Sequence, residues 1–76
     1  MITVKLYGLL RVESGIREVT LNARTVRDVL RHLENSGIPR ADLLGCVILL
    51  NGKPATKRTG LTDGDTVVLM SPVAGG

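Results

Sequence analysis

The sequence predicts an α+β fold in which a mixed sheet of four to five strands carries one main helix on one face. Three observations support this prediction. The first residues alternate between apolar and polar side chains, one amphipathic helical pattern follows, and two apolar strand patterns with turn signals come after it. The chain has 76 residues, and a chain of that length supports at most one hydrophobic core.

The first two strands are expected before residue 22. Residues 2–7 alternate in the period-two manner of a half-buried strand, and Gly8 interrupts that pattern. Residues 13–15 are interpreted as the turn between the strands, because Glu-Ser-Gly is typical of a tight connection. The second strand then covers residues 16–21, with Val19 and Leu21 facing the core.

The main helix is predicted from its cap and its apolar stripe. Thr25 can accept hydrogen bonds from the free N–H groups of the first turn, and Asp28 lies three residues later, as in a capping box. One apolar stripe follows at helical spacing, formed by Val26, Val29, Leu30 and Leu33. Gly37 and Pro39 are typical of a helix end. The helix should therefore cover about residues 26–36.

The second half of the chain supplies the remaining strands. Residues 38–45 are interpreted as an irregular connection, and residues 46–50 as a continuous apolar strand that ends at an Asn-Gly turn. Residues 54–60 form a loop or a short edge strand, and residues 66–71 form the last strand. Proline cannot donate to a strand ladder, so regular pairing should stop at Pro72.

This order of elements predicts a β-grasp fold. The order is strand, strand, helix, strand, strand, and the helix must cover one face of the sheet because its single stripe has no other surface to pack on. The first and last strands should be neighbours. We expect one domain over residues 1–71 and a flexible Gly-Gly tail over residues 72–76.

The composition argues against several other functions. The formal net charge is +3, but the ten basic residues are scattered along the sequence and Tyr7 is the only aromatic residue. Since single-stranded nucleic acid is bound by stacking platforms in basic grooves, we expect no nucleic-acid partner. No apolar run is long enough to span a membrane, and Met1 leads directly into a strand pattern, so no membrane segment or signal peptide is expected.

The reactive side chains do not form a catalytic or metal-binding pattern. A lone cysteine gives neither a disulfide framework nor zinc spacing, and a reducing cytoplasm is the simplest compartment for it. Cys46 should pack in the core as a small hydrophobic residue, and His32 should lie on the helix face away from the stripe. Asp63 and Asp65 flank a turn glycine without the other ligands of a calcium loop. We expect no catalytic residue, no metal and no tightly bound cofactor.

The chain resembles, over essentially its whole length, the small subunit of molybdopterin synthase, the MoaD family, and more loosely the other MoaD/ThiS-type sulfur carriers. The resemblance lies in the Asp-Gly-Asp turn at residues 63–65, the apolar strand after it, and the ending Pro72-Val73-Ala74-Gly75-Gly76. The start of the chain, residues 4–11, also looks like the first strand of that family. Ser71 stands where the family commonly has a proline, and Tyr7 and Met70 stand where it often has phenylalanine.

The resemblance implies a ubiquitin-like fold and a sulfur carrier that is not catalytic alone. An E1-like enzyme of the MoeB/ThiF type would use ATP to adenylate the Gly76 carboxylate, and a sulfur donor would convert it to a thiocarboxylate. That sulfur would pass to a pterin precursor held by a large subunit of the MoaE type, in a heterotetramer that makes the molybdenum cofactor. The tail from Pro72 through Val73, Ala74 and Gly75 to Gly76 would enter the partner enzymes, since glycine lets a backbone lie close to a channel wall.

Strand alternation predicts a docking face for these partners. If Val67 and Leu69 face the helix, Val68 and Met70 point outward. Tyr7 also points outward from the first strand, and by resemblance to ubiquitin-like folds Leu49 joins them. An exposed apolar cluster of this kind often marks a partner surface.

Two alternatives stay open at this stage. The same thiocarboxylate chemistry could serve thiamine, cysteine or another sulfur product. A ubiquitin-like protein modifier would instead attach Gly76 to a lysine through an isopeptide bond.

Overall fold

The computed structural model describes residues 1–71 and shows a five-stranded mixed sheet in the order β2-β1-β5-β3-β4. At its centre, β1 (Ile2–Tyr7) runs parallel to β5 (Thr66–Met70) and antiparallel to β2 (Glu18–Leu21). On the other side of β5, β3 (Val47–Leu50) runs antiparallel to it and pairs with the short β4 (Lys53–Pro54). The predicted neighbouring of the first and last strands is confirmed.

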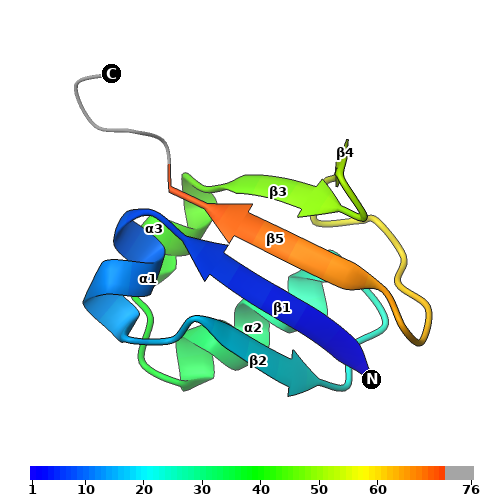
Figure 1. Ribbon diagram of the computed structural model, residues 1–76, viewed down its shortest axis with the longest axis horizontal. Helices are drawn as coiled ribbons and strands as arrows, with labels where there is room; N and C mark the ends of the chain where they lie inside the picture. The colour runs from blue at the N-terminus through cyan, green and yellow to red at the C-terminus, as the bar shows by residue number, and fades with distance from the viewer. Residues whose placement is uncertain (72–76) are drawn as a thin grey trace.

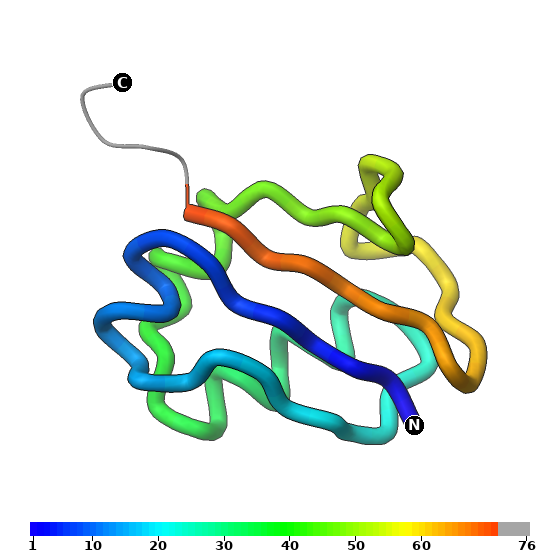
Figure 2. The backbone as a smooth tube through the Cα atoms, in the orientation of Figure 1, coloured from blue at the N-terminus to red at the C-terminus, as the bar shows by residue number. Residues whose placement is uncertain are grey.

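All helices lie on one face of this sheet (Figure 1). They are α1 (Leu9–Ser14), α2 (Val26–Asn35) and α3 (Arg40–Leu44). The opposite face carries no covering element among residues 1–71. Because β1 and β5 are parallel, the N-terminus and the end of β5 lie at opposite ends of the sheet, as the tube in Figure 2 shows.

The core forms between the sheet and α2. The inward-facing residues of β1 and β5 are 0–2% exposed, and they are Ile2, Val4, Leu6, Val67 and Leu69. The four stripe residues of α2 are all buried against them, as the helical spacing predicts. Val19 and Leu21 of β2 also contribute to this core, so their predicted orientation is confirmed.

Both predicted ends of α2 are confirmed. Thr25 Oγ1 accepts a hydrogen bond from the Asp28 N–H at 3.3 Å, and the Asp28 carboxylate accepts one from the Thr25 N–H, which completes a capping box. At the other end the Ile38 N–H donates to the Leu33 carbonyl and the Gly37 N–H donates to the Glu34 carbonyl. This is the Schellman pattern, and Gly37 supports it with a φ of 107°.

Two short helices were not predicted. Residues 13–15 are not a simple turn, because residues 9–14 form α1 and Gly15 ends it in the left-handed conformation. β2 therefore begins at Glu18, two residues later than expected. Residues 38–45 are not irregular throughout, because α3 occupies residues 40–44. Each short helix buries only one leucine, Leu10 in α1 and Leu43 in α3, which leaves no periodic stripe to detect.

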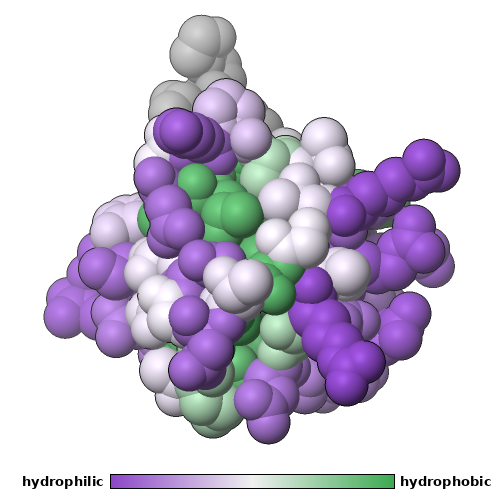
Figure 3. Space-filling view, turned by 90° about the vertical axis from the view of Figure 1, so that its right-hand side faces the viewer, coloured by the Kyte–Doolittle hydropathy of each residue, from purple (hydrophilic) through white to green (hydrophobic). Residues whose placement is uncertain are grey.

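The side of the molecule near the N-terminus and the loop before β5 is mixed in polarity. Figure 3 shows hydrophilic side chains around this side, with a band of intermediate and hydrophobic residues between them. Within residues 1–71, the structure has no helix with the length and apolar character that crossing a membrane requires.

Candidate functional site

The four residues predicted for the docking face lie together on the open face of the sheet. The strand register places Tyr7 of β1 beside Met70 of β5, and Val47 of β3 on the other side of Met70. The next outward-facing row contains Val68, with Leu49 as its partner on β3. Two adjacent rows of the sheet therefore present mainly apolar side chains.

We call this cluster the open-face patch, defined by Tyr7, Val47, Leu49, Val68 and Met70. Tyr7 is 41% exposed and Val47 is 44% exposed, while the other three are half-buried. Val47 was missing from the predicted face, although the same alternation that points Leu49 outward also points Val47 outward. On the β1 side the patch is bordered by Lys5, which is paired with Val68 on β5 and with Glu18 on β2.

The chain leaves the sheet at the edge of this patch. β5 ends at Met70, and Ser71 is the last residue that the structure describes. The Ser71 hydroxyl oxygen accepts a hydrogen bond of 2.6 Å from the Leu9 N–H, at the start of α1. The exit point of the chain is thus held against the loop that follows β1.

Gly8 makes this contact possible. Its φ of 69° and ψ of −144° lie in a region that is essentially reserved for glycine. A Cβ atom at this position would lie 2.5 Å from the Ser71 side-chain oxygen, which is well inside van der Waals contact. The absence of a side chain at Gly8 therefore lets Ser71 approach the β1–α1 junction closely.

The predicted tail residues lie outside the described part of the chain. These are Pro72, Val73, Ala74, Gly75 and Gly76. Their predicted role in partner insertion, and that of Gly76 as the modified residue, stay predictions. What the structure adds is their starting point, since residue 72 must follow directly from Ser71 beside the open-face patch.

The titratable groups near the sheet serve the fold. The Asp65 carboxylate accepts hydrogen bonds from the Thr62 N–H at 2.8 Å and from the Asn51 side-chain amide at 3.0 Å, and both lower its pKa. The pKa of Asp28 is lowered in the same way, chiefly by the Arg24 N–H. Both carboxylates stabilise a turn or a helix start, as expected for Asp65.

Cys46 also has a structural role. It packs against the core, as predicted, and its thiol donates to the Leu43 carbonyl at 3.0 Å. Burial raises the pKa of the thiol, which keeps it protonated and a poor nucleophile. Across residues 1–71 there is no cluster of three histidine, cysteine or acidic side chains that could hold a metal ion.

Known proteins of several kinds share this fold. The sequence matches the ThiS family over residues 4–76. No curated protein sequence matches the chain at a significant level. Solved structures do match: small archaeal modifier protein 1 from Methanosarcina acetivorans is 28% identical, with a TM-score of 0.79 and coverage of 99% of this chain and 95% of that one.

Two protein complexes contain similar chains. One is the complex of subunits 1 and 2 of molybdopterin-converting factor from Helicobacter pylori, at 25% identity and a TM-score of 0.75, covering 99% of this chain and 97% of the other. The other is the BexX/CysO complex of Amycolatopsis orientalis, at 22% identity and a TM-score of 0.76, with both chains fully covered. The second likeness shows the shared fold alone.

The predicted β-grasp is thus ubiquitin-like, and its match to a family covers nearly every residue. The match includes the tail residues that the sequence singled out, and the last strand before them ends at Met70 in the open-face patch. This chain belongs to the ThiS family of ubiquitin-like sulfur carriers and modifiers.

Proposed function

We propose that this chain is the sulfur-carrying small subunit of a molybdopterin synthase, and that the Gly76 carboxylate carries the sulfur. The observation that supports it most is the position of the open-face patch, which lies where the chain leaves β5 towards Gly76. A partner that covers the patch would have the tail at the edge of its interface. Five residues from Pro72 reach about 17 Å when extended, which is enough to enter a buried site.

The chemistry begins with activation of a poor electrophile. An oxygen of the Gly76 carboxylate bonds to the α-phosphorus of ATP, and pyrophosphate leaves. A sulfide-equivalent nucleophile then attacks the acyl carbon, and AMP leaves with the electron pair of the broken C–O bond. An E1-like enzyme of the MoeB/ThiF type performs the adenylation and a sulfur donor supplies the nucleophile of the second step. ATP is therefore a substrate of the partner, and this chain needs no tightly bound cofactor.

Transfer then returns Gly76 to its starting state. The thiocarboxylate sulfur attacks a carbon of the pterin precursor held by a large subunit of the MoaE type, and an oxygen leaving group departs from that carbon with the electron pair of the broken C–O bond. Water then attacks the acyl carbon and cleaves the acyl–sulfur bond, so that the sulfur stays on the pterin as a thiolate and Gly76 regains its carboxylate. Two such transfers build the dithiolene, which fits a heterotetramer with two small subunits. In this scheme the chain is a co-substrate whose catalytic pocket belongs to its partner, in the cytoplasm where ATP is available.

The open-face patch provides the docking surface in this proposal. The fold does not require its five apolar residues to be covered. When a partner packs on them, their apolar surface is removed from water, and this burial favours association. The likeness to a subunit of the Helicobacter pylori molybdopterin-converting factor supports a large-subunit partner of this class.

The second candidate is a protein modifier. It is favoured by the 28% identity and TM-score of 0.79 to small archaeal modifier protein 1 of Methanosarcina acetivorans. A modifier would use the same adenylate but would end in an isopeptide bond from Gly76 to a lysine. Sulfur carriers for thiamine, cysteine or other products share the thiocarboxylate and differ only in the acceptor.

Affinity purification from the native cells tests the assignment. The molybdopterin proposal predicts that the protein, tagged at its N-terminus, recovers a large synthase subunit together with an adenylating enzyme. A variant that lacks Gly76 should fold and bind the large subunit but should no longer transfer sulfur. Recovery of an adenylating enzyme together with Gly76-linked lysine conjugates, and no synthase subunit, would favour the modifier.

A further inference from the structure

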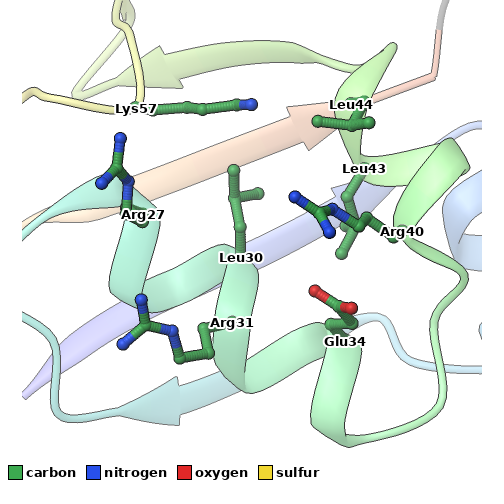
Figure 4. Close-up of a pocket in the computed structure, with 8 residues that line it drawn as sticks. All are labelled: Arg27, Leu30, Arg31, Glu34, Arg40, Leu43, Leu44 and Lys57. Carbon is green, nitrogen blue, oxygen red and sulfur yellow. The ribbon is translucent and has the colours of Figure 1, made fainter.

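A basic groove lies on the helical side of the molecule, away from the open-face patch. It runs between α2 and α3, and the loop after β4 forms its third wall. Figure 4 shows the eight residues that line it and the space that they surround. The groove has a volume of about 310 Å³ and includes four basic side chains and three leucines.

The groove concentrates the positive charge of the whole protein. Its basic residues are Arg27, Arg31, Arg40 and Lys57, and its single acidic residue is Glu34. The local net charge is therefore +3, equal to that of the entire chain, because the six basic and six acidic residues elsewhere cancel. The residues are spread over 31 positions in the sequence, from Arg27 to Lys57, so only the fold brings them together.

Within residues 1–71, none of these four cations makes an ion pair. Across residues 1–71 the only ion pair joins the Met1 ammonium to Asp63, outside the groove. All four basic side chains are exposed, and Glu34 makes no ion pair with any of them within that range. Close positive charges of this kind repel each other, and an anionic partner would relieve that repulsion.

Two of the three groove walls are joined by backbone hydrogen bonds. The Arg27 N–H donates to the Lys57 carbonyl at 3.0 Å, and the Val26 N–H donates to the Thr59 carbonyl at 3.0 Å. These bonds tie the loop that carries Lys57 to the start of α2. Because less ordering is then required on binding, a preformed groove binds more tightly than a mobile one.

The floor of the groove favours a peptide over a nucleic acid. Leu30 and Leu43 are buried at its base, whereas Leu44 is 55% exposed at its rim. No aromatic ring lines the groove, so bases would have no platform on which to stack. Carboxylates could pair with the arginines while an aliphatic side chain covers Leu44.

We propose that this groove is a second protein-interaction surface, which binds an acidic peptide segment that also carries aliphatic side chains. Since α2 and α3 cover the sheet face opposite the open-face patch, both surfaces can be occupied together. One partner could then bind the groove while the tail of the same molecule occupies the site of another enzyme.

A labelled peptide of alternating glutamate and leucine tests this proposal on the full chain by fluorescence anisotropy. We expect saturable binding that weakens as salt is raised from about 50 to 200 mM, because screening lowers the attraction between exposed charges. Amide chemical shifts should change in α2, α3 and around Lys57. Shifts confined to the open-face patch would overturn the assignment.

Charge-reversal variants distinguish binding in the groove from general electrostatic attraction between the peptide and the basic protein. The double variant Arg27→Glu and Arg40→Glu should weaken peptide binding by about tenfold or more. The matched control Arg11→Glu and Arg17→Glu makes the same change in net charge outside the groove, and should change the affinity by no more than about twofold. Equal losses in both variants would refute a local site.

Two further probes test the apolar part. The variant Leu44→Ser should weaken binding of the same peptide, as should replacement of the peptide leucines by serine. If neither change has an effect, the interaction is diffuse electrostatics and the proposal is wrong. Tighter binding of a uridine oligonucleotide than of the peptide at about 150 mM salt would also overturn it, in favour of a nucleic-acid surface.

Discussion

The variant Gly8→Ala tests how the exit point of the tail is held. Gly8 combines a backbone conformation that other residues rarely adopt with a contact that leaves no room for a side chain. An alanine Cβ would lie 2.5 Å from the Ser71 side-chain oxygen, which itself accepts the 2.6 Å hydrogen bond from Leu9. The substitution must therefore strain the backbone and displace Ser71.

The expected loss of stability follows from these two effects. A non-glycine residue in such a region of φ and ψ costs about 1–3 kcal/mol. Loss of the hydrogen bond to Leu9 adds about 1 kcal/mol. We expect a decrease of about 2–4 kcal/mol in the free energy of unfolding, which lowers the melting temperature of a domain this size by about 10 °C or more.

Urea unfolding of the unmodified protein, Gly8→Ala, Ser71→Ala and the double variant separates the backbone strain from the loss of the hydrogen bond. Ser71→Ala alone should cost about 1 kcal/mol, since Leu9 loses its acceptor. In the Gly8→Ala background the same substitution should cost less or even stabilise, because it removes the atom that clashes. A loss below about 0.5 kcal/mol for Gly8→Ala, or strict additivity of the two substitutions, would refute the proposed contact.

Three other variants test separate parts of the structure. Thr25→Ala removes the cap of α2 and should lower the free energy of unfolding by about 1–2 kcal/mol, measured by urea denaturation; no change would contradict the capping box. Asp65→Asn should destabilise more at neutral than at acidic pH. The pKa of Asp65 in the fold is below its ordinary value of 3.8, so its stabilisation is present above about pH 4 and is lost as the pH falls through the lowered value. A difference between the two proteins that is the same at every pH would exclude this linkage. Met70→Asp should leave the fold intact and weaken binding to a purified large subunit by about tenfold or more in calorimetric titration. The control Thr20→Asp, at the other end of the sheet, should leave both the fold and the binding unchanged. Unchanged binding by Met70→Asp would show that the open-face patch is not the docking surface.

Much of this fold could be predicted from short sequence patterns. α2 has both a capping box and a stripe of four apolar residues, so propensity, caps and periodicity all agree. The central strands were also predicted from the sequence, and alternate residues of β1 and β5 are almost fully buried in the structure. Strand alternation also placed Tyr7, Val68 and Met70 on one face, whereas Leu49 was assigned to that face by resemblance to ubiquitin-like folds.

The elements that were missed depend on tertiary contacts. α1 starts after Gly8, which offers no side-chain cap, and its first N–H is satisfied by Ser71, 62 residues away. α3 follows Pro39, which was interpreted only as the residue that stops α2, although proline is also well suited to the start of a helix. The basic groove could not be predicted, since Arg27 and Lys57 become neighbours only through the bond between their backbones.

The mass of the intact protein isolated from its native cells tests the central claim most directly. A thiocarboxylate replaces one terminal oxygen by sulfur and adds about 16 Da at Gly76. The proposal predicts this species, and predicts that it disappears when the adenylating enzyme is deleted. A terminal carboxylate in every free molecule, with Gly76 found only in isopeptide bonds to lysine, would contradict the role as a sulfur carrier.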